Sequence, residues 1–339
     1  MGTKSVDRRY GTVKFFFVVG FLHLIGITGI LSVRHGHPLF LGMAFLAYTL
    51  GLRHAFDIDH IAAIDNTVRK LVQQNRNPAG VGFFFSLGHS TVVFLLAVCT
   101  AFSVQWVHDK LPYLKEVGGI IGTLVSGIFL LLIGLVNLII LKNISQAFLK
   151  MRRKKYGEEE FDSLLLSRGF LSRFIRPLYA FINQSWHVYP LGFLFGLGFD
   201  TASEVALLAM SAGAVKNALP LSGILALPIL FAAGMSLLDT ADGVFMTTSY
   251  RWALNNPVRK IYYNLTVTAI SVLSALLIGL VELAQIVVPQ LGLTGGFWLY
   301  IQDLNLGALG YILVALFVCV WGVSYCVWKW FRIEERWGQ

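Results

Sequence analysis

Residues 52–66 place charged and imidazole side chains in a segment that has the length and position of a membrane span. The segment continues without a break from the apolar run 39–50, yet it contains one Arg, three Asp and two His. A single Asp or Arg at the centre of a transmembrane helix costs roughly 2.5 to 3.5 kcal/mol on insertion scales, so such residues normally face a partner, a cavity or an ion path. The sequence therefore predicts a functional site here.

The side chains of this segment offer nitrogen and oxygen donors together. Two imidazoles and three carboxylates suit borderline divalent cations such as Ni²⁺, Co²⁺ and Zn²⁺ better than hard Mg²⁺ or soft Cu⁺. On an ideal helix His54, Asp57 and His60 fall within a sector of about 120°, so they can converge on one ion. Asp59 points away from Asp57 on that geometry. It lies behind the ligands, pairs with Arg53, or reaches the ion because the helix is locally unwound.

The elements that must position these side chains are predicted to be membrane-spanning helices. The chain has 339 residues, of which 56% are hydrophobic and 13% charged, and its mean hydropathy is +0.69. Several runs of about twenty apolar residues predict an all-α polytopic membrane protein with eight transmembrane helices in a single domain, 1–339. The expected spans are 13–33, 39–66, 79–103, 117–141, 188–212, 221–247, 261–288 and 304–328.

The distribution of Lys and Arg between these spans predicts the orientation of the protein. With both termini cytoplasmic, 22 of these residues lie on the inner side and four outside, while Arg53 lies within the second span. This asymmetry is a strong positive-inside signal, and it makes the 142–187 connection between spans four and five cytoplasmic. The basic residues flank apolar spans and form no soluble face, so the net charge of +9 does not indicate nucleic-acid binding.

Polar clusters also occur in spans three, five and six. A lone histidine on an apolar helix is more often a satisfied core residue than a ligand. Four polar clusters in one membrane domain favour a shared site, because each intramembrane ionisable group needs a partner. The candidate site residues of these three spans are His89, Asp200, Glu204, Asp239 and Asp242.

Three glycines, Gly192, Gly196 and Gly198, precede Asp200 in the fifth span. Their spacing is typical of close helix packing. Equally, they could let the helix break before Asp200 and expose carbonyl oxygens to an ion. The sequence leaves both interpretations open.

A weak internal repeat relates spans two and three to spans five and six. Phe-Asp at 56–57 recurs at 199–200, and Ser86–Ser90 recurs loosely as Ser236–Thr240. Related spans run in opposite directions on the predicted topology, which is the signature of an inverted repeat, whereas chance similarity between apolar segments is the alternative.

Four segments resemble the signature motifs of the nickel/cobalt transporter family. They are Arg53-His-Ala-Phe-Asp-Ile-Asp-His60, Ser86-Leu-Gly-His-Ser90, Leu197-Gly-Phe-Asp-Thr-Ala-Ser-Glu204 and Gly234-Met-Ser-Leu-Leu-Asp-Thr-Ala-Asp242. All four occur in order, and the resemblance extends over essentially the whole chain. It implies high-affinity uptake of Ni²⁺, with Co²⁺ as a second substrate, by a secondary transporter in the cytoplasmic (inner) membrane of a prokaryote.

The resemblance also implies roles for individual residues. The family's HX4DH motif corresponds to His54, Asp59 and His60, with Asp57 inside it. His23 corresponds to a variable position in the first span that helps to set the preference for nickel or cobalt, although packing is its alternative role. The implied mechanism is alternating access, in which the histidines and aspartates of span two and His89 bind the ion. The acids of spans five and six would balance charge or receive the ion further in.

In this interpretation the metal ion is the substrate, and no cofactor and no enzymatic activity are implied. The chain contains no Walker motif, so ATP hydrolysis by this chain and an ATPase subunit are not expected. A membrane-embedded metalloenzyme is one alternative. It lacks support because an HExxH motif is absent and the eight histidines are spread over the chain. A membrane sensor that binds a metal ion without moving it is the other alternative.

Overall fold

The computed structural model describes residues 3–33, 37, 40–102, 104–152, 182–198, 202–254, 257–304, 306 and 309–330. All regular secondary structure in these ranges is helical. The helices are α1 (Thr3–Val33), α2 (Phe40–His54), α3 (Ile58–Gln73), α4 (Val81–Phe102), α5 (Val104–Arg152), η1 (Ser185–Val188), α8 (Tyr189–Phe195), η2 (Gly196–Gly198), α9 (Ala202–Lys216), α10 (Leu221–Leu254), α11 (Pro257–Gln290), α12 (Gly296–Gln302) and α13 (Leu309–Trp330).

Six helices within these residues are long and apolar enough to cross a membrane. They lie in α1, α4, α5, α10, α11 and α13. The segments Ser185–Gly198 and Ser203–Lys216 form a pair bent by 73°, which makes a seventh span if the pair crosses as one. The chain is therefore a helical membrane protein. Of the predicted 142–187 connection, residues 142–152 continue α5, and residues 153–181 lie outside the described part.

The continuous helix expected over 39–66 is wrong, because α2 ends at His54 and α3 begins only at Ile58. Between them the N–H of Phe56 donates to the carbonyl oxygen of Arg53 at 3.0 Å, which is a turn instead of an α-helical bond. Asp57 then adopts an extended backbone, with φ −63° and ψ 138°, before α3 starts. The predicted second span is thus two helices of 15 and 16 residues.

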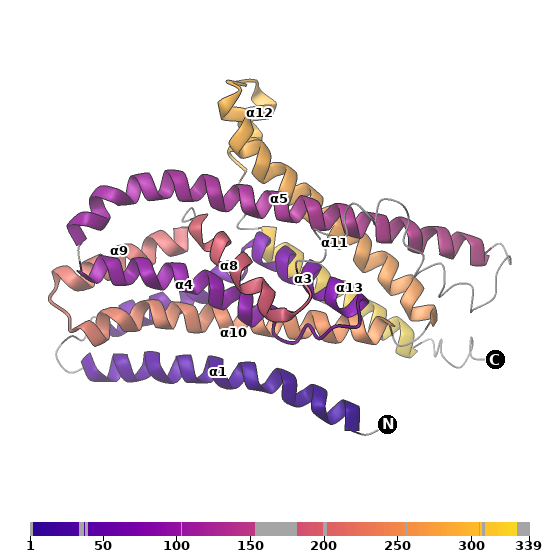
Figure 1. Cartoon of the computed structure of the whole chain (residues 1–339), viewed down its shortest axis with the longest axis horizontal. Helices are drawn as coiled ribbons and strands as arrows, with labels where there is room; N and C mark the ends of the chain where they lie inside the picture. The colour runs from indigo at the N-terminus through magenta and orange to yellow at the C-terminus, as the bar shows by residue number, and fades with distance from the viewer. Residues whose placement is uncertain are drawn as a thin grey trace.

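Helix α3 occupies the centre of the bundle (Figure 1). It packs against α4, α5, α10, α11 and α13. Its side chains from His60 to Val72 are all buried, including those of Asp65, Arg69 and Lys70. The outer helices α1 and α5 instead expose apolar side chains such as Phe17 and Leu135, as expected where helices face lipid. The beginning of α1 and the end of α13 lie at the same end of the bundle (Figure 1).

The glycines of the fifth predicted span lie both at the end of an α-helix and at a close contact between helices. Helix α8 ends at Phe195, and a 3₁₀ turn follows over Gly196–Gly198, so the α-helix does end there. A Cβ atom on Gly192 would lie 2.0 Å from the carbonyl oxygen of Phe85, so this glycine is also required for the close packing of α8 on α4. Asp200 lies outside the described residues.

Candidate metal centre

Three buried imidazole rings meet beside the break between α2 and α3. His54 is the last residue of α2, His60 lies in the first turn of α3, and His89 lies near the middle of α4. The Nε2 atoms of His54 and His89 are 2.8 Å apart. One ring nitrogen from each of the three histidines lies within 4.8 Å of the others, and each residue is at most 4% exposed. Three nitrogen donors at this spacing could hold one divalent metal ion.

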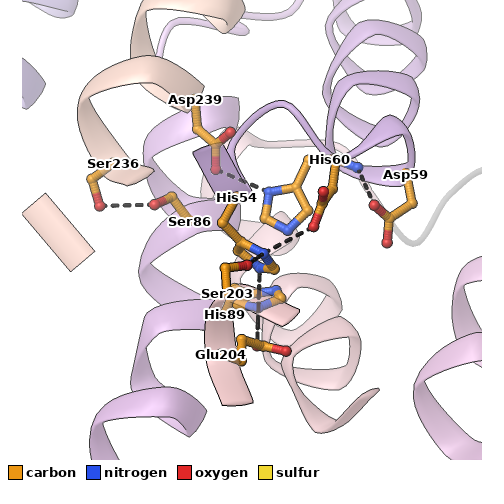
Figure 2. Close-up of polar contacts among 10 residues, drawn as sticks. His54, Asp59, His60, Ser86, His89, Ser203, Glu204, Ser236 and Asp239 are labelled. Carbon is orange, nitrogen blue, oxygen red and sulfur yellow. Dashed lines mark hydrogen bonds and ion pairs between the residues drawn. The ribbon is translucent and has the colours of Figure 1, made fainter. Parts of the chain in front are cut away.

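The other ring nitrogen of two of these histidines contacts an oxygen atom. The Nδ1 atom of His60 lies 3.2 Å from Oδ2 of Asp239 on α10. The Nδ1 atom of His54 lies 2.9 Å from Oδ2 of Asp57 and 3.2 Å from Oγ of Ser203 on α9. An Nδ1–H that donates to a carboxylate leaves the lone pair of the ring on Nε2 and fixes the orientation of the ring. These contacts therefore direct both Nε2 lone pairs toward the centre of the cluster (Figure 2).

Glu204 supplies an oxygen atom to the same centre. Its Oε1 atom lies 2.8 Å from Nε2 of His89 and 3.9 Å from Nε2 of His54, and the residue is 2% exposed. The Nε2 atom of His60 has no hydrogen-bond partner among the described residues. A buried nitrogen with an unused lone pair is uncommon unless a ligand satisfies it. Three imidazole nitrogens and one carboxylate oxygen make a donor set that suits Ni²⁺, Co²⁺ or Zn²⁺.

Helix α13 closes the bundle over the break that separates His54 from His60. A Cβ atom on Gly310 would lie 1.6 Å from the carbonyl oxygen of Phe56, so only glycine allows this approach. The ring of Phe56 stacks on Tyr311 with 4.7 Å between ring centroids. The non-helical backbone of the break is thereby packed against protein and shielded from lipid, as irregular backbone at membrane depth must be.

The predicted convergence of His54, Asp57 and His60 on one helix face is corrected by this geometry. The two histidines do meet, but they do so because the chain turns between them. Asp57 contacts the outer nitrogen of His54 instead of joining the three nitrogen donors. Asp59 accepts a hydrogen bond from the backbone N–H of His60 at 2.9 Å. The helix is locally unwound before Asp59, as one of the three alternatives for this residue required. The hydrogen bond from His60 to Asp59 anchors the first turn of α3.

His23 and Asp242 lie apart from the three imidazoles. The Nδ1 atom of His23 is 2.8 Å from the carbonyl oxygen of Val19 on its own helix, and its Nε2 atom is 3.2 Å from the hydroxyl of Tyr48. Asp242 lies on α10, one helical turn beyond Asp239. Neither belongs to the group of three histidines that could share an ion.

Sequence reasoning missed two sets of polar contacts. The hydroxyl of Ser203 contacts Nδ1 of His54. In the sequence, only the position of Ser203 next to Glu204 could have suggested a role for it. A second network links Asp65 and Arg69 on α3 with Tyr250 on α10. The separation of Asp65 and Arg69 by four residues on one helix was the available signal for an intrahelical ion pair.

The helical bundle and the buried donors at a broken helix define a polytopic membrane protein with an internal cluster of side chains that could hold a metal ion. The chain belongs to the NicO family, whose model, described as "High-affinity nickel-transport protein", matches residues 40–327. It is 57% identical over 333 residues to a protein of Staphylococcus aureus named "Nickel transporter NixA", covering 98% of each chain. No solved structure gives a significant match.

Two other relatives have names that refer to nickel in one case and to cobalt in the other. A "High-affinity nickel-transport protein NixA" of Helicobacter pylori (strain ATCC 700392 / 26695) is 51% identical over 321 residues, covering 93% of this chain and 96% of its own. A "Cobalt transport protein NhlF" of Rhodococcus rhodochrous is 36% identical over 330 residues, covering 94% of this chain and 92% of its own.

Proposed function

We propose that this protein takes up Ni²⁺ through the cytoplasmic membrane of a prokaryotic cell and that the ion binds between His54, His60, His89 and Glu204. The observation that carries this proposal is the buried group of three imidazoles with Glu204 at the break between α2 and α3. The family and the relatives named as nickel transporters support it. Co²⁺ prefers the same donors, and one relative is named a cobalt transporter, so Co²⁺ is a second proposed substrate.

The metal ion is the substrate, and in this proposal the protein supplies binding and passage without a catalytic reaction. Asp57 and Asp239 orient the two histidines through Nδ1, because a carboxylate on the outer nitrogen fixes the ring and raises its basicity. The inside-negative membrane potential drives the dication inward. At 100 mV it contributes about 4.6 kcal/mol, because each charge is worth roughly 2.3 kcal/mol.

We propose that residues 1–339 form one transport domain with eight spans. Helices α2 and α3 form one broken span, and η1, α8, η2 and α9 form another, in addition to the six long helices. A broken span whose irregular part lies inside the bundle is a common way to build an ion site at the membrane midplane. Both termini then lie in the cytoplasm, in agreement with the excess of inner over outer basic residues, which is still 20 to four when the buried Arg69 and Lys70 are left out of the inner group.

This topology predicts the readout of reporter fusions. A reporter that is active only in the cytoplasm is expected to be active when fused after Gln339 or inserted near Gly157, because both positions adjoin clusters of basic residues. The same reporter near Lys216, between α9 and α10, is expected to be inactive and serves as the control. Activity near Lys216 with inactivity at the other two positions would contradict the topology.

Glycine contacts on opposite sides of the imidazoles support the proposed inverted repeat. The first lies between α2 and α10, which run parallel to each other: the start of α10, at Gly223, lies beside Phe40 at the start of α2, and Phe231 lies beside Gly51. A Cβ atom on Gly51 would lie 2.1 Å from the carbonyl oxygen of Phe231, and one on Gly234 would lie 2.6 Å from that of Tyr48. In the proposed topology this contact lies in the external half of the protein.

The second contact lies between α4 and α8, in the cytoplasmic half of the proposed topology. A Cβ atom on Gly192 would lie 2.0 Å from the carbonyl oxygen of Phe85, and one on Gly88 would lie 2.1 Å from that of Tyr189. The two contacts use the same residue types in the same roles. They pair a Tyr-x-Leu-Gly segment, at 48–51 or 189–192, with a Phe-x2-Gly-x-Ser segment, at 231–236 or 85–90.

This correspondence aligns residues 85–90 with residues 231–236. The alignment is shifted by four residues from the sequence-based one, which matched Ser86–Ser90 with Ser236–Thr240. Two-fold related contacts on either side of a central site suit alternating access, because each can separate while the other stays closed. In our proposal the α2–α10 contact closes the site from outside, and the α4–α8 contact closes it from the cytoplasm.

Purified protein in liposomes provides the test. Radioactive Ni²⁺ is expected to accumulate inside when an inside-negative potential is imposed, and excess Co²⁺ is expected to compete. Liposomes without protein and proteoliposomes without a potential are the controls. Binding of Ni²⁺ without accumulation would indicate a sensor, and turnover of a lipid or peptide without accumulation would indicate a metalloenzyme. Either result would overturn the proposed transport.

A further inference from the structure

Helices α3 and α10 run in parallel beyond the imidazoles, and their contacts advance together along both helices. His60 contacts Asp239 at 3.2 Å. Further along, a Cβ atom on Gly243 would lie 3.7 Å from Cγ2 of Ile64. The hydroxyl of Tyr250 then donates to Oδ1 of Asp65. The interface thus leads from the imidazoles toward the last turns of both helices.

Three carboxylates lie along this interface: Asp239, Asp242 and Asp65. Asp242 precedes the glycine that packs beside Ile64, and it is close enough to Asp65 and Asp239 to interact with both electrostatically. Asp65 is 0% exposed and Asp239 1%. Among the described residues one oxygen of each lacks a hydrogen-bond partner, namely Oδ1 of Asp239 and Oδ2 of the other two. Buried carboxylate oxygens without donors are costly, and a cation between them removes that cost.

Arg69 lies at the far end of this line of acids. Its Nη2 atom donates to the hydroxyl of Tyr250 at 2.6 Å, to the carbonyl oxygen of Val267 at 3.0 Å, and to the hydroxyl of Ser271. The same atom lies 4.0 Å from Oδ2 of Asp65. These contacts hold a buried positive charge between α3, α10 and α11, where it balances Asp65.

We propose that Asp65 and Asp242, together with Asp239, form a second cation site through which the metal ion passes from the imidazoles to the cytoplasm. This inference rests on the proposed function. A site made of oxygen donors alone holds Ni²⁺ less tightly than one rich in imidazole. The fixed charge of Arg69 weakens it further by repulsion. Weak binding suits this position, since an ion that is to leave must not be held tightly.

Asp242→Asn separates this role from that of the imidazoles. In detergent the variant is expected to bind Ni²⁺ with an affinity within about twofold of the unchanged protein, whereas its initial uptake rate in proteoliposomes falls at least ~10-fold, because only a step after binding is affected. Asp303→Asn, which removes a carboxylate from an exposed position after α12, is the matched control and is expected to change neither quantity. Loss of binding and uptake in equal measure would place Asp242 in the primary site and overturn the inference, as would normal uptake.

Arg69 offers a second test with a different readout. Arg69→Gln is expected to raise the Ni²⁺ bound at equilibrium from about one to about two ions per chain, because the repulsion at Asp65 is removed. Arg69→Lys keeps the charge and is expected to stay near one, and Arg69→Gln combined with Asp65→Asn is expected to return to one. A stoichiometry that stays at one in Arg69→Gln overturns the inference; if this variant does not fold, the Asp242→Asn comparison decides alone. Failure of the unchanged protein to bind or accumulate Ni²⁺ would instead refute the proposed function.

Discussion

His60→Ala and Glu204→Gln are each expected to abolish Ni²⁺ uptake at low external concentration and to weaken equilibrium binding by more than ~100-fold. Removal of a group that only orients a metal ligand typically costs 10- to 100-fold, and removal of the ligand itself costs more. Asp239→Asn is therefore expected to have the smaller effect, because Asp239 contacts the outer nitrogen of His60. Titration of Ni²⁺ into purified protein measures the affinities, and proteoliposomes measure uptake.

The control for these variants is Cys99→Ala. Cys99 is an exposed residue of α4, and its thiol makes no contact with the three imidazoles, so both measurements are expected to be unchanged. Unchanged uptake in His60→Ala would exclude this histidine as a ligand. A larger loss of affinity in Asp239→Asn than in His60→Ala would indicate that the ion binds to the carboxylates of α10 instead of the imidazoles.

Gly51→Ala and Gly192→Ala are expected to destabilise the protein by about 1 to 3 kcal/mol or more and to reduce uptake severely. The added methyl group would lie about 2 Å from a backbone carbonyl oxygen in each case, at 2.1 Å and 2.0 Å, and a backbone atom cannot rotate away as a side chain can. The helices must then separate along their length. Thermal unfolding in detergent measures the stability, and proteoliposome uptake measures the activity.

Two other glycines are matched controls for these substitutions. Gly42 lies on α2 like Gly51, Gly213 lies on α9 in the same proposed span as Gly192, and a Cβ atom on either would meet nothing within 4 Å. Gly42→Ala and Gly213→Ala are expected to be as stable as the unchanged protein or slightly more stable, because alanine favours helix. Equal stability in all four variants would mean that α2–α10 and α4–α8 are not closely packed.

The three histidines of the centre were predictable from the sequence alone. An ionisable side chain inside an apolar span is costly, so the apolar sequence around His54, His60 and His89 indicated a functional role for these residues. The break that brings the first two together was not predictable. Residues 55–57 include no glycine or proline, the usual signals of a helix end. What accommodates the break is a contact with Gly310, which lies more than 250 residues later in the chain.

The oxygen donors could be assigned only by family resemblance or by tertiary packing. Glu204 and Asp239 stood among several acids of spans five and six, and no spacing within one helix indicated which acid would reach a histidine of another. Asp65 was visible as a charge within the second span. Its contact with Tyr250 depends on the parallel packing of α3 and α10, which the order of elements does not determine.

The burial of α3 also constrains how the chain can be assembled during its synthesis. A helix that carries Asp65, Arg69 and Lys70 would not stay in hydrocarbon alone, because its charges would lack partners there. The groups that satisfy Arg69 are made much later, since Tyr250 follows it by 181 residues and Ser271 by 202. A nascent chain that ends before α10 therefore has no stable place for α3 within the bilayer. The centre of this protein is encoded near the beginning but can close only after most of the chain has left the ribosome.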